Sequence, residues 1–246
     1  MCGRYSLFAP PEDVEDLFGA TFSEPFEPRY NAAPRQSLPV IPDAAPATIE
    51  TMEWGFVPPW ADDRSEFGYI NARAETLAEK PTFRGAFAGD GGDDLRVGRC
   101  LVPADGFYEW TETGGGKQPY RITLTDGEPF AMAGLWAEWR PSGTQTGLDA
   151  FGSGEVDAEP EVVSTYTIVT TEPNDLVGDL HDRMSVILPR ERERRWLREG
   201  AEAVADLLAP YPAREMQAYP VSQTVNDPSN DSPAVVERVE TNGGPE

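Results

Sequence analysis

The chain has 246 residues, with 43 Asp and Glu against 20 Lys and Arg and a formal net charge of −23. This length allows one large domain or two small ones, and no apolar run approaches the ~20 residues that span a bilayer. No secretory signal is evident, and two cysteines, Cys2 and Cys100, argue against a disulfide framework. We therefore expect a cytoplasmic protein in which Cys100 fills the core.

The basic residues are almost all arginines, because Lys80 and Lys117 are the two lysines of the chain. An acidic, lysine-poor composition is typical of a halophile, whose molar internal salt favours carboxylates that keep the surface hydrated. At such salt the Debye length is about 3 Å. The net charge therefore does not exclude a phosphate-bearing partner, since a local cluster of arginines can still bind phosphate.

The first half of the chain predicts one helix and several strands. Residues 9–20 (APPEDVEDLFGA) predict a short helix, with prolines at its start, acids in its first turn and Gly19 after its apolar end. After a proline-rich segment, residues 37–41 and 48–60 predict strands, the second ending at a Pro-Pro-Trp corner. Residues 70–87 predict a strand end that leads into a helical turn.

The second half is richer in strands. Residues 99–110 predict one or two strands, and residues 119–139 predict a hairpin that turns at Asp126-Gly127. Residues 162–171 (VVSTYTIVTT) predict a strand, and residues 189–210 predict helical structure interrupted near Gly200.

The element order points to one fold class. Strands outnumber helices and do not alternate with them, which argues against a doubly wound parallel sheet. We predict a single α+β domain over residues 1–225 with an antiparallel, barrel-like core and a few peripheral helices. Residues 141–161 are expected to form a flexible surface loop, and residues 226–246 an acidic, flexible tail.

The start of the chain, MCGRYS, places Cys2 directly after the initiator methionine. If Met1 is removed, Cys2 carries a thiol and a free α-amine on adjacent carbons. An α-amine titrates at about 7.7–8.0, so it is partly unprotonated at neutral pH and can form a Schiff base with an aldehyde. The thiol can then close a thiazolidine ring. The motif alone also fits retention of Met1, or a Cys2 that is a small buried hydrophobe.

Four further residues are candidates for chemistry. His181 is the single histidine and its ordinary pKa of about 6.5 suits proton transfer, although a lone histidine is often structural. Glu109 lies between aromatic residues. Two interpretations are open for Glu109: its side chain faces outward on an alternating strand, or it is partly buried and has a raised pKa. Asn71 and Arg73 are two positions apart, so on an extended segment both side chains face one way. Asn71 could orient a sugar hydroxyl or a carbonyl, and Arg73 could hold a phosphate. One histidine and two cysteines argue against a zinc site.

Six blocks occur in order along the chain: MCGRY (1–5), RYNAAP (29–34), WGFVPPW (54–60), INARAET (70–76), RCLVPADGFYEW (99–110) and LHDRM (180–184). In these blocks the chain resembles the SRAP family, the SOS-response-associated peptidases, over nearly its whole length. The resemblance implies an α+β domain with a distorted β-barrel core. It also implies recognition of abasic sites in single-stranded DNA and a thiazolidine cross-link through the processed amino-terminal cysteine.

The resemblance implies a role for each matching residue. Cys2 is the nucleophile, and Asn71 positions the reacting sugar or amine. Glu109 and His181 transfer protons during imine formation, ring opening and reversal, with strand cleavage of the lyase type as an associated activity. The implied DNA-binding residues are Arg4, Asn31, Pro34, Trp60, Arg73, Trp110 and Arg183. We expect a monomer without metal, cofactor or membrane contact that meets the replication machinery.

Three other functions remain open. An amidotransferase with an amino-terminal cysteine nucleophile also begins Met-Cys-Gly, but this chain is short for an added substrate domain. The family name suggests a peptidase that removes its own Met1, although general proteolysis lacks a separate nucleophile, base and orienting group. A non-covalent single-stranded DNA binding module would bind reversibly, without dependence on an abasic site.

Overall fold

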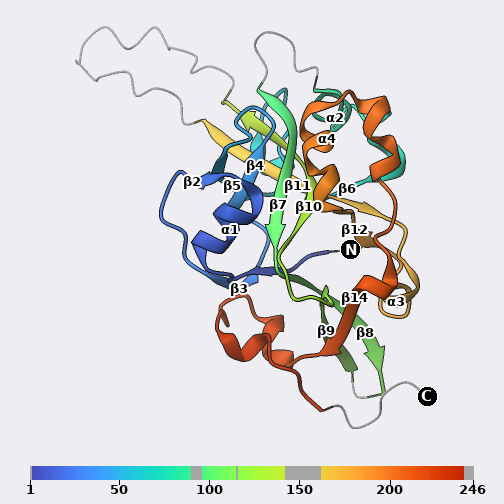
Figure 1. Ribbon diagram of the computed structural model, residues 1–246. Coiled ribbons are helices and arrows are strands. Elements are labelled where there is room, and N and C mark those ends of the chain that lie inside the picture. Colours follow the sequence, from blue (N-terminus) through green and yellow to red (C-terminus); the bar gives the residue numbers. More distant parts are fainter. Residues whose placement is uncertain (1, 90–95, 115, 142–161, 241–246) are drawn as a thin grey trace, which may run out of the picture.

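The computed structural model describes residues 2–89, 96–114, 116–141 and 162–240 (Figure 1). Apart from Pro141, the surface loop expected over 141–161 lies outside these residues, as do residues 241–246. The described chain folds around two sheets, which lie one above the other in Figure 1.

Five strands of the larger sheet close into a barrel, in the order β11-β10-β7-β4-β5 and back to β11. Four of the five contacts are antiparallel. The closing contact is parallel, with Thr165 opposite Glu53 and Tyr166 opposite Trp54. The barrel-like α+β core is thus confirmed, with one parallel contact in place of an all-antiparallel sheet. The barrel strands are β4 (Ser37–Pro42), β5 (Thr48–Trp54), β7 (Val97–Ala104), β10 (Phe130–Trp139) and β11 (Val163–Thr171).

Short strands extend the barrel. β6 (Asn71–Arg73) continues along the β5 side of β11, and β12 (Met184–Ser185) pairs with β11 on its other side. Both β6 and β12 therefore meet β11 at its carboxyl-terminal end. β13 (Ile187–Leu188) pairs with β10, and β2 (Thr21–Phe22) pairs with β5.

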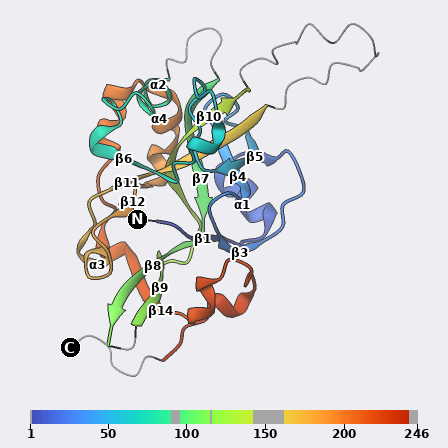
Figure 2. The ribbon, with the colours of Figure 1, turned by 180° about the vertical axis from the view of Figure 1, so that it is seen from behind.

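The second sheet is antiparallel, with the strand order β14-β9-β8-β1-β3. It lies below the barrel in Figures 1 and 2. Its strands are β1 (Tyr5–Leu7), β3 (Arg29–Ala32), β8 (Gly106–Thr113), β9 (Gly116–Leu124) and β14 (Met216–Pro220). The block 99–110 is thus divided between β7 of the barrel and β8 of this sheet.

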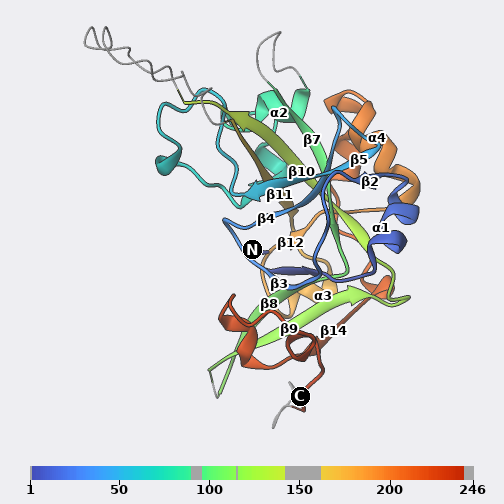
Figure 3. The ribbon, with the colours of Figure 1, turned by 90° about the vertical axis from the view of Figure 1, so that its left-hand side faces the viewer.

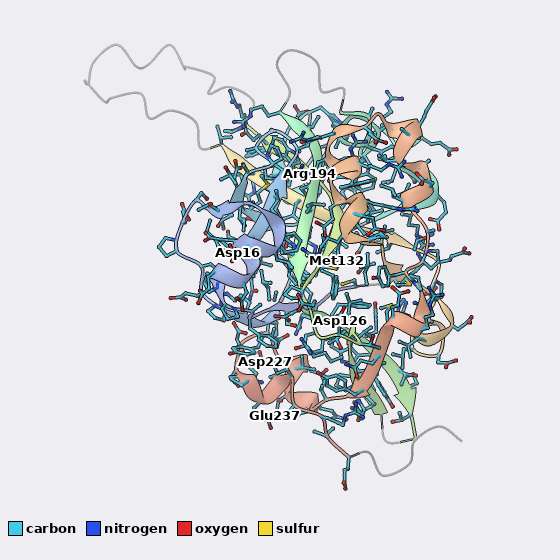
Figure 4. The ribbon with its side chains drawn as sticks, viewed as in Figure 1. Asp16, Asp126, Met132, Arg194, Asp227 and Glu237 are labelled. Carbon is cyan, nitrogen blue, oxygen red and sulfur yellow. The ribbon has the colours of Figure 1, made fainter. Side chains whose placement is uncertain are left out.

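The hairpin expected over residues 119–139 does not form. β9 pairs with β8 and β14, whereas β10 pairs with β7 and β11. The expected turn exists, with Gly127 at φ 77° and the Asp126 carboxylate accepting the Glu128 amide at 3.0 Å. Asp126 lies where the two sheets meet (Figure 4), so the turn leads the chain from one sheet into the other. Turn chemistry is local, whereas strand pairing here is decided by distant segments.

The helices are short and peripheral. α1 (Pro11–Phe18) ends at Gly19, whose φ of 62° is left-handed, as the sequence predicts. α2 (Arg84–Ala88) and α4 (Glu193–Arg198) lie together against one side of the barrel in Figure 2. The interruption near Gly200 is confirmed, because α4 ends there and η4 (Ala201–Leu207) follows. The other helical segments are α3 (Asp175–Gly178), η1 (Arg64–Glu66), η2 (Ala74–Thr76), η3 (Arg190–Arg192), η5 (Ala213–Glu215), η6 (Gln223–Asn226) and η7 (Pro233–Val235). None of the described helices has the length and apolar character that crossing a bilayer requires.

The carboxyl-terminal segment differs from the flexible tail expected over 226–246. Residues 226–240 pack beside the second sheet (Figure 3), and Val235 is fully buried. The Asp231 carboxylate accepts the amides of Tyr30 and Asn31 at 2.6 and 2.9 Å and pairs with Arg29 at 3.2 Å. Asp231 lies in an acidic segment whose composition is typical of a flexible tail, but in the structure its carboxylate binds the backbone of β3.

The core between the two sheets contains both cysteines, each buried and free. Met132 is central in this cluster (Figure 4). The hydroxyl groups of Tyr5 and Tyr166, which belong to the same cluster, are hydrogen-bonded to each other at 2.7 Å. Cys100 thus fills the core as expected, whereas Cys2 brings the amino terminus of the chain into it.

Candidate active site around Cys2

Cys2 is completely buried, three residues before β1. Its carbonyl oxygen accepts a 2.9 Å hydrogen bond from the Asn71 side-chain amide, and its thiol donates to the Arg4 carbonyl at 3.7 Å. Burial, with a contribution from the charge of nearby Glu109, raises the pKa of the Cys2 thiol to about 12. The sulfur is therefore protonated at neutral pH, and a thiolate has to be generated during any reaction.

Glu109 lies on β8 opposite Tyr120, and its side chain faces the interior. Burial raises its pKa to about 7, and the charge of Asp182 acts in the same direction. Of the two readings that the sequence leaves open, the structure supports the buried carboxyl. Such a group is poised to accept and donate protons near neutral pH.

His181 follows α3, with its amide bonded to the Val177 carbonyl at 2.8 Å. Its Nδ1 accepts the Arg183 amide at 3.0 Å and lies 2.8 Å from the Asp182 carboxylate. Burial lowers the pKa of His181, while the charge of Asp182 opposes this change. The imidazole is therefore mainly neutral at neutral pH and available as a proton acceptor.

Arg183 is engaged in an ion pair. Its guanidinium donates to both oxygens of Glu75 at 2.7 and 2.9 Å and to the Thr170 carbonyl at 2.7 Å. The hydrogen bonds lower the pKa of Glu75. Arg183 thus joins β11 to η2, while Arg73, just before η2, is exposed and has no ion pair among the described residues. Arg73 is the better placed of the two cations for a phosphate.

Three of the predicted DNA-binding residues converge on the carboxyl-terminal segment. Arg4 donates to the Asn31 side chain at 2.9 Å and to the carbonyls of Val225 and Asn226 at 2.6 and 3.0 Å. The Trp110 indole donates to the Asn226 side chain at 2.7 Å. The Asn31 amide donates to the carbonyls of Val225, Asp227 and Asn230. In this structure these side chains fix residues 225–230 against the second sheet, and their contact with DNA stays a prediction.

Exposed aromatic rings lie on the segment that leads to β6. Trp60 is 54% exposed and meets Phe67 edge-on at 5.5 Å, and Tyr69 is 43% exposed and packs on Phe67 at 6.2 Å. We call Trp60, Phe67 and Tyr69 the aromatic strip. Sequence reasoning singled out Trp60 and missed Tyr69, although Tyr69 lies two residues before Asn71.

Pro34 lies in the turn before β4. The next residue, Arg35, has φ 68°, and its amide donates to the Trp54 carbonyl at 2.8 Å. A rigid proline before a left-handed residue sets this turn, so a role in shaping a DNA cleft stays a prediction.

A buried hydroxyl was also missed. Ser185 on β12 is completely buried, and its side chain lowers the pKa of the Cys2 thiol against the larger effect of burial. The sequence signal was its place directly after the LHDRM block. Around Cys2 the structure therefore assembles an amide, a carboxyl and a hydroxyl, from β6, β8 and β12. Within the described ranges, no three His, Cys, Asp or Glu side chains are grouped to hold a metal.

Comparison with known proteins matches this chain to one family and to several similar proteins. Residues 1–228 match the family described as SOS response associated peptidase (SRAP). The chain is 40% identical over 247 residues to the abasic site processing protein YoqW of Bacillus subtilis, covering 96% of this chain and 99% of that protein. It is 31% identical over 239 residues to the Gallus gallus abasic site processing protein HMCES, covering 87% and 67%.

The fold is shared as well. A crystal structure of a Bacteroides thetaiotaomicron protein matches with a TM-score of 0.79 and 27% identity, covering 97% of this chain and 100% of that one. The match of the family over residues 1–228, with a 40% identical relative covered over 99% of its length, shows that the chain belongs to the SRAP family.

Proposed function

We propose that this protein processes abasic sites in single-stranded DNA and does so by forming a covalent thiazolidine with the open-chain sugar. The α-amine and the thiol of Cys2, exposed as a pair by removal of Met1, are the two nucleophiles. The observation that carries the proposal is the packing of Cys2 against Asn71 and Glu109, with the pKa of Glu109 raised to about 7. Relatives that bear the name abasic site processing protein support the substrate class.

The first step joins the amine to the sugar. The Cys2 nitrogen attacks the C1′ aldehyde, and the resulting carbinolamine loses water to give an imine. Protonated Glu109 donates a proton to the departing hydroxyl, and its ionised form takes protons from the attacking groups. The Asn71 hydrogen bond to the Cys2 carbonyl fixes the backbone next to the reacting nitrogen.

The second step closes the ring. The Cys2 sulfur adds to the imine carbon, the C=N electron pair moves to nitrogen, and the thiol proton passes by way of Glu109 to that nitrogen. The reverse sequence opens the ring, and neutral His181 accepts and returns protons in this reversal and in lyase-type strand cleavage. Arg73 contacts a phosphate, and the aromatic strip stacks on unpaired bases.

The test compares single strands with and without an abasic site on a denaturing gel. The protein lacking Met1 is expected to give a shifted band with the abasic strand alone, and Cys2→Ala is expected to give none without borohydride. Cys2→Ser is the matched control, because it exchanges the sulfur for a hydroxyl of similar size. Both variants keep the amine, so we expect from each a band only when borohydride is added.

Other outcomes of the same test point to other functions. Native-gel binding that is equal for intact and abasic strands, with no band after denaturation, would indicate a non-covalent binding module. Labelling of Cys2 by a glutamine-analogue electrophile, unaffected by DNA and without any adduct, would indicate an amidotransferase. Either result would overturn the proposal.

A further inference from the structure

We propose that Ser185 is a further catalytic residue of this site, whose hydroxyl donates a hydrogen bond to the Cys2 sulfur and stabilises the thiolate formed as the thiazolidine ring closes and opens. The inference rests on the proposed function and concerns the thiol step alone.

Strand register directs Ser185 towards Cys2. Ser185 lies opposite Thr170 on the β11–β12 ladder, and Arg73 lies opposite the same Thr170 on the β6 side. Directly opposite residues project their side chains to the same face of a sheet. Asn71, opposite Ile168, shares this face, and Ile168 belongs to the core cluster that contains Cys2. Ser185 and Asn71 therefore approach Cys2 from the two sides of β11.

The Ser185 hydroxyl is otherwise unsatisfied. Its Oγ is buried and makes no hydrogen bond to any of the described residues. A buried hydroxyl without a partner costs about 1–3 kcal/mol, and such a group in a folded protein calls for an explanation. The Cys2 sulfur, weakly accepting as a thiol and strongly as a thiolate, supplies one.

The surroundings of the sulfur make this hydroxyl useful. The titratable groups that face the thiol are Glu109 from β8, Tyr5 from β1 and Tyr166 from β11. Burial raises the pKa of both tyrosines, so they are neutral, and Glu109 disfavours a second negative charge. Among the side chains around the sulfur, Ser185 is the one that lowers the pKa of the thiol and so favours the thiolate.

The proton and electron changes are balanced. The thiol proton passes to the Glu109 carboxylate, the sulfur forms a bond to the imine carbon, the C=N electron pair moves to nitrogen, and Glu109 returns the proton to that nitrogen, which becomes the ring N–H. The Ser185 proton stays on its own oxygen throughout. A hydrogen bond that is strong to the Cys2 thiolate and weak to the neutral thiol lowers the barrier to ring closure and to ring opening. Its loss is expected to slow ring closure and ring opening about tenfold or more.

The test separates the amine step from the thiol step in Ser185→Ala. Borohydride traps the imine, so trapping reports the amine step, whereas adduct that resists denaturation without borohydride reports ring closure. We expect imine trapping within about twofold of the parent and ring closure slowed about tenfold. We also expect alkylation of Cys2 by iodoacetamide, followed on the Cys2 peptide, to shift to higher pH.

Thr167→Val is the matched control. Thr167 is another completely buried hydroxyl without a hydrogen-bond partner in the described chain, and it projects from the opposite face of β11. Its removal is expected to leave both steps and the alkylation profile unchanged.

The inference is overturned if Ser185→Ala closes the ring at the parent rate, or if trapping and closure fall equally, which denotes a structural role. An unshifted alkylation profile, which needs no DNA, overturns it independently. Absence of any adduct from the parent protein would instead contradict the proposed function.

Discussion

The side-chain amide of Asn71 holds the backbone of Cys2 by a 2.9 Å hydrogen bond to its carbonyl oxygen, across 69 positions of sequence. Asn71 is the first residue of β6, which is fixed by its pairing with β11 of the barrel. The barrel therefore sets the position of the Cys2 backbone, and with it the nitrogen that becomes the α-amine. A loop at the amino terminus would leave that nitrogen mobile.

Asn71→Ala is expected to slow cross-linking about tenfold, because one positioning hydrogen bond worth about 1 kcal/mol or somewhat more is lost. Asn71→Asp is expected to be slower still, since a carboxylate would face the Cys2 carbonyl without a donor. Initial rates of adduct formation measure both. Asn230→Ala is the control, because its side-chain bond to the Thr224 carbonyl lies in the carboxyl-terminal segment. Equal rates for the parent and both Asn71 variants would remove Asn71 from the site.

Glu109→Gln is expected to slow cross-linking by about 100-fold or more, the usual effect of losing a general acid and base. In the parent, ionised Glu109 takes the thiol proton, so the rate should rise with pH around about 7, where this carboxyl titrates. The remaining rate of the variant should follow the α-amine alone, with a midpoint at about 7.7–8.0. Glu112→Gln, on the exposed part of the same strand, is the control. A pH–rate profile that is identical in parent and Glu109→Gln would contradict this role.

The buried carboxyl of Glu193 leads to a separate prediction, which concerns the stability of the fold. Glu193 begins α4, is 7% exposed, and burial raises its pKa from 4.5 to about 7. Between these values the folded protein binds a proton that the unfolded chain has released, so the free energy of unfolding falls as pH rises. The loss from this group amounts to about 3 kcal/mol at most.

Glu193→Gln is therefore expected to show a smaller decrease in unfolding free energy between about pH 4.5 and pH 7 than the parent. Urea unfolding at several pH values measures it, with exposed Glu202→Gln as the control. A decrease as steep as that of the parent would show that this carboxyl is not held protonated by burial.

The aromatic strip is expected to contribute to DNA affinity. Trp60→Ala and Tyr69→Ala should each weaken binding of a single strand by about 1–3 kcal/mol, the value of one stacked base. Dissociation constants measured in a Cys2→Ala background avoid the covalent step. Trp60→Phe keeps a ring and should retain most of the affinity. If the alanine variants bind as tightly as the parent, the DNA path lies elsewhere on the molecule.

Local chemistry could be predicted from the sequence. The α1 helix follows from its prolines, first-turn acids and Gly19, all within twelve residues, and the break at Gly200 follows in the same way. The block INARAET gives a strand and then a helical turn because both signals are local. The six blocks identified the family, and with it Asn71 and Glu109, which the structure places beside Cys2.

Partnerships across the chain could not be predicted. The Asp126-Gly127 turn is the same whether its flanking strands pair with each other or with distant strands. The prediction of a β9–β10 hairpin was therefore wrong. Asp231 looks like tail composition until β3 is placed beside it. Arg183 looks like a free cation until Glu75 is found within 2.7 Å. Each depends on contacts between residues far apart in the sequence, which local patterns do not contain.

The most direct test is the intact mass of the product formed with an abasic single strand. Our account requires a mass equal to the chain without Met1 plus the DNA, minus one water, stable without borohydride and with the modification confined to the Cys2 peptide. An adduct that retains Met1, lies on another residue or persists in Cys2→Ala would contradict it.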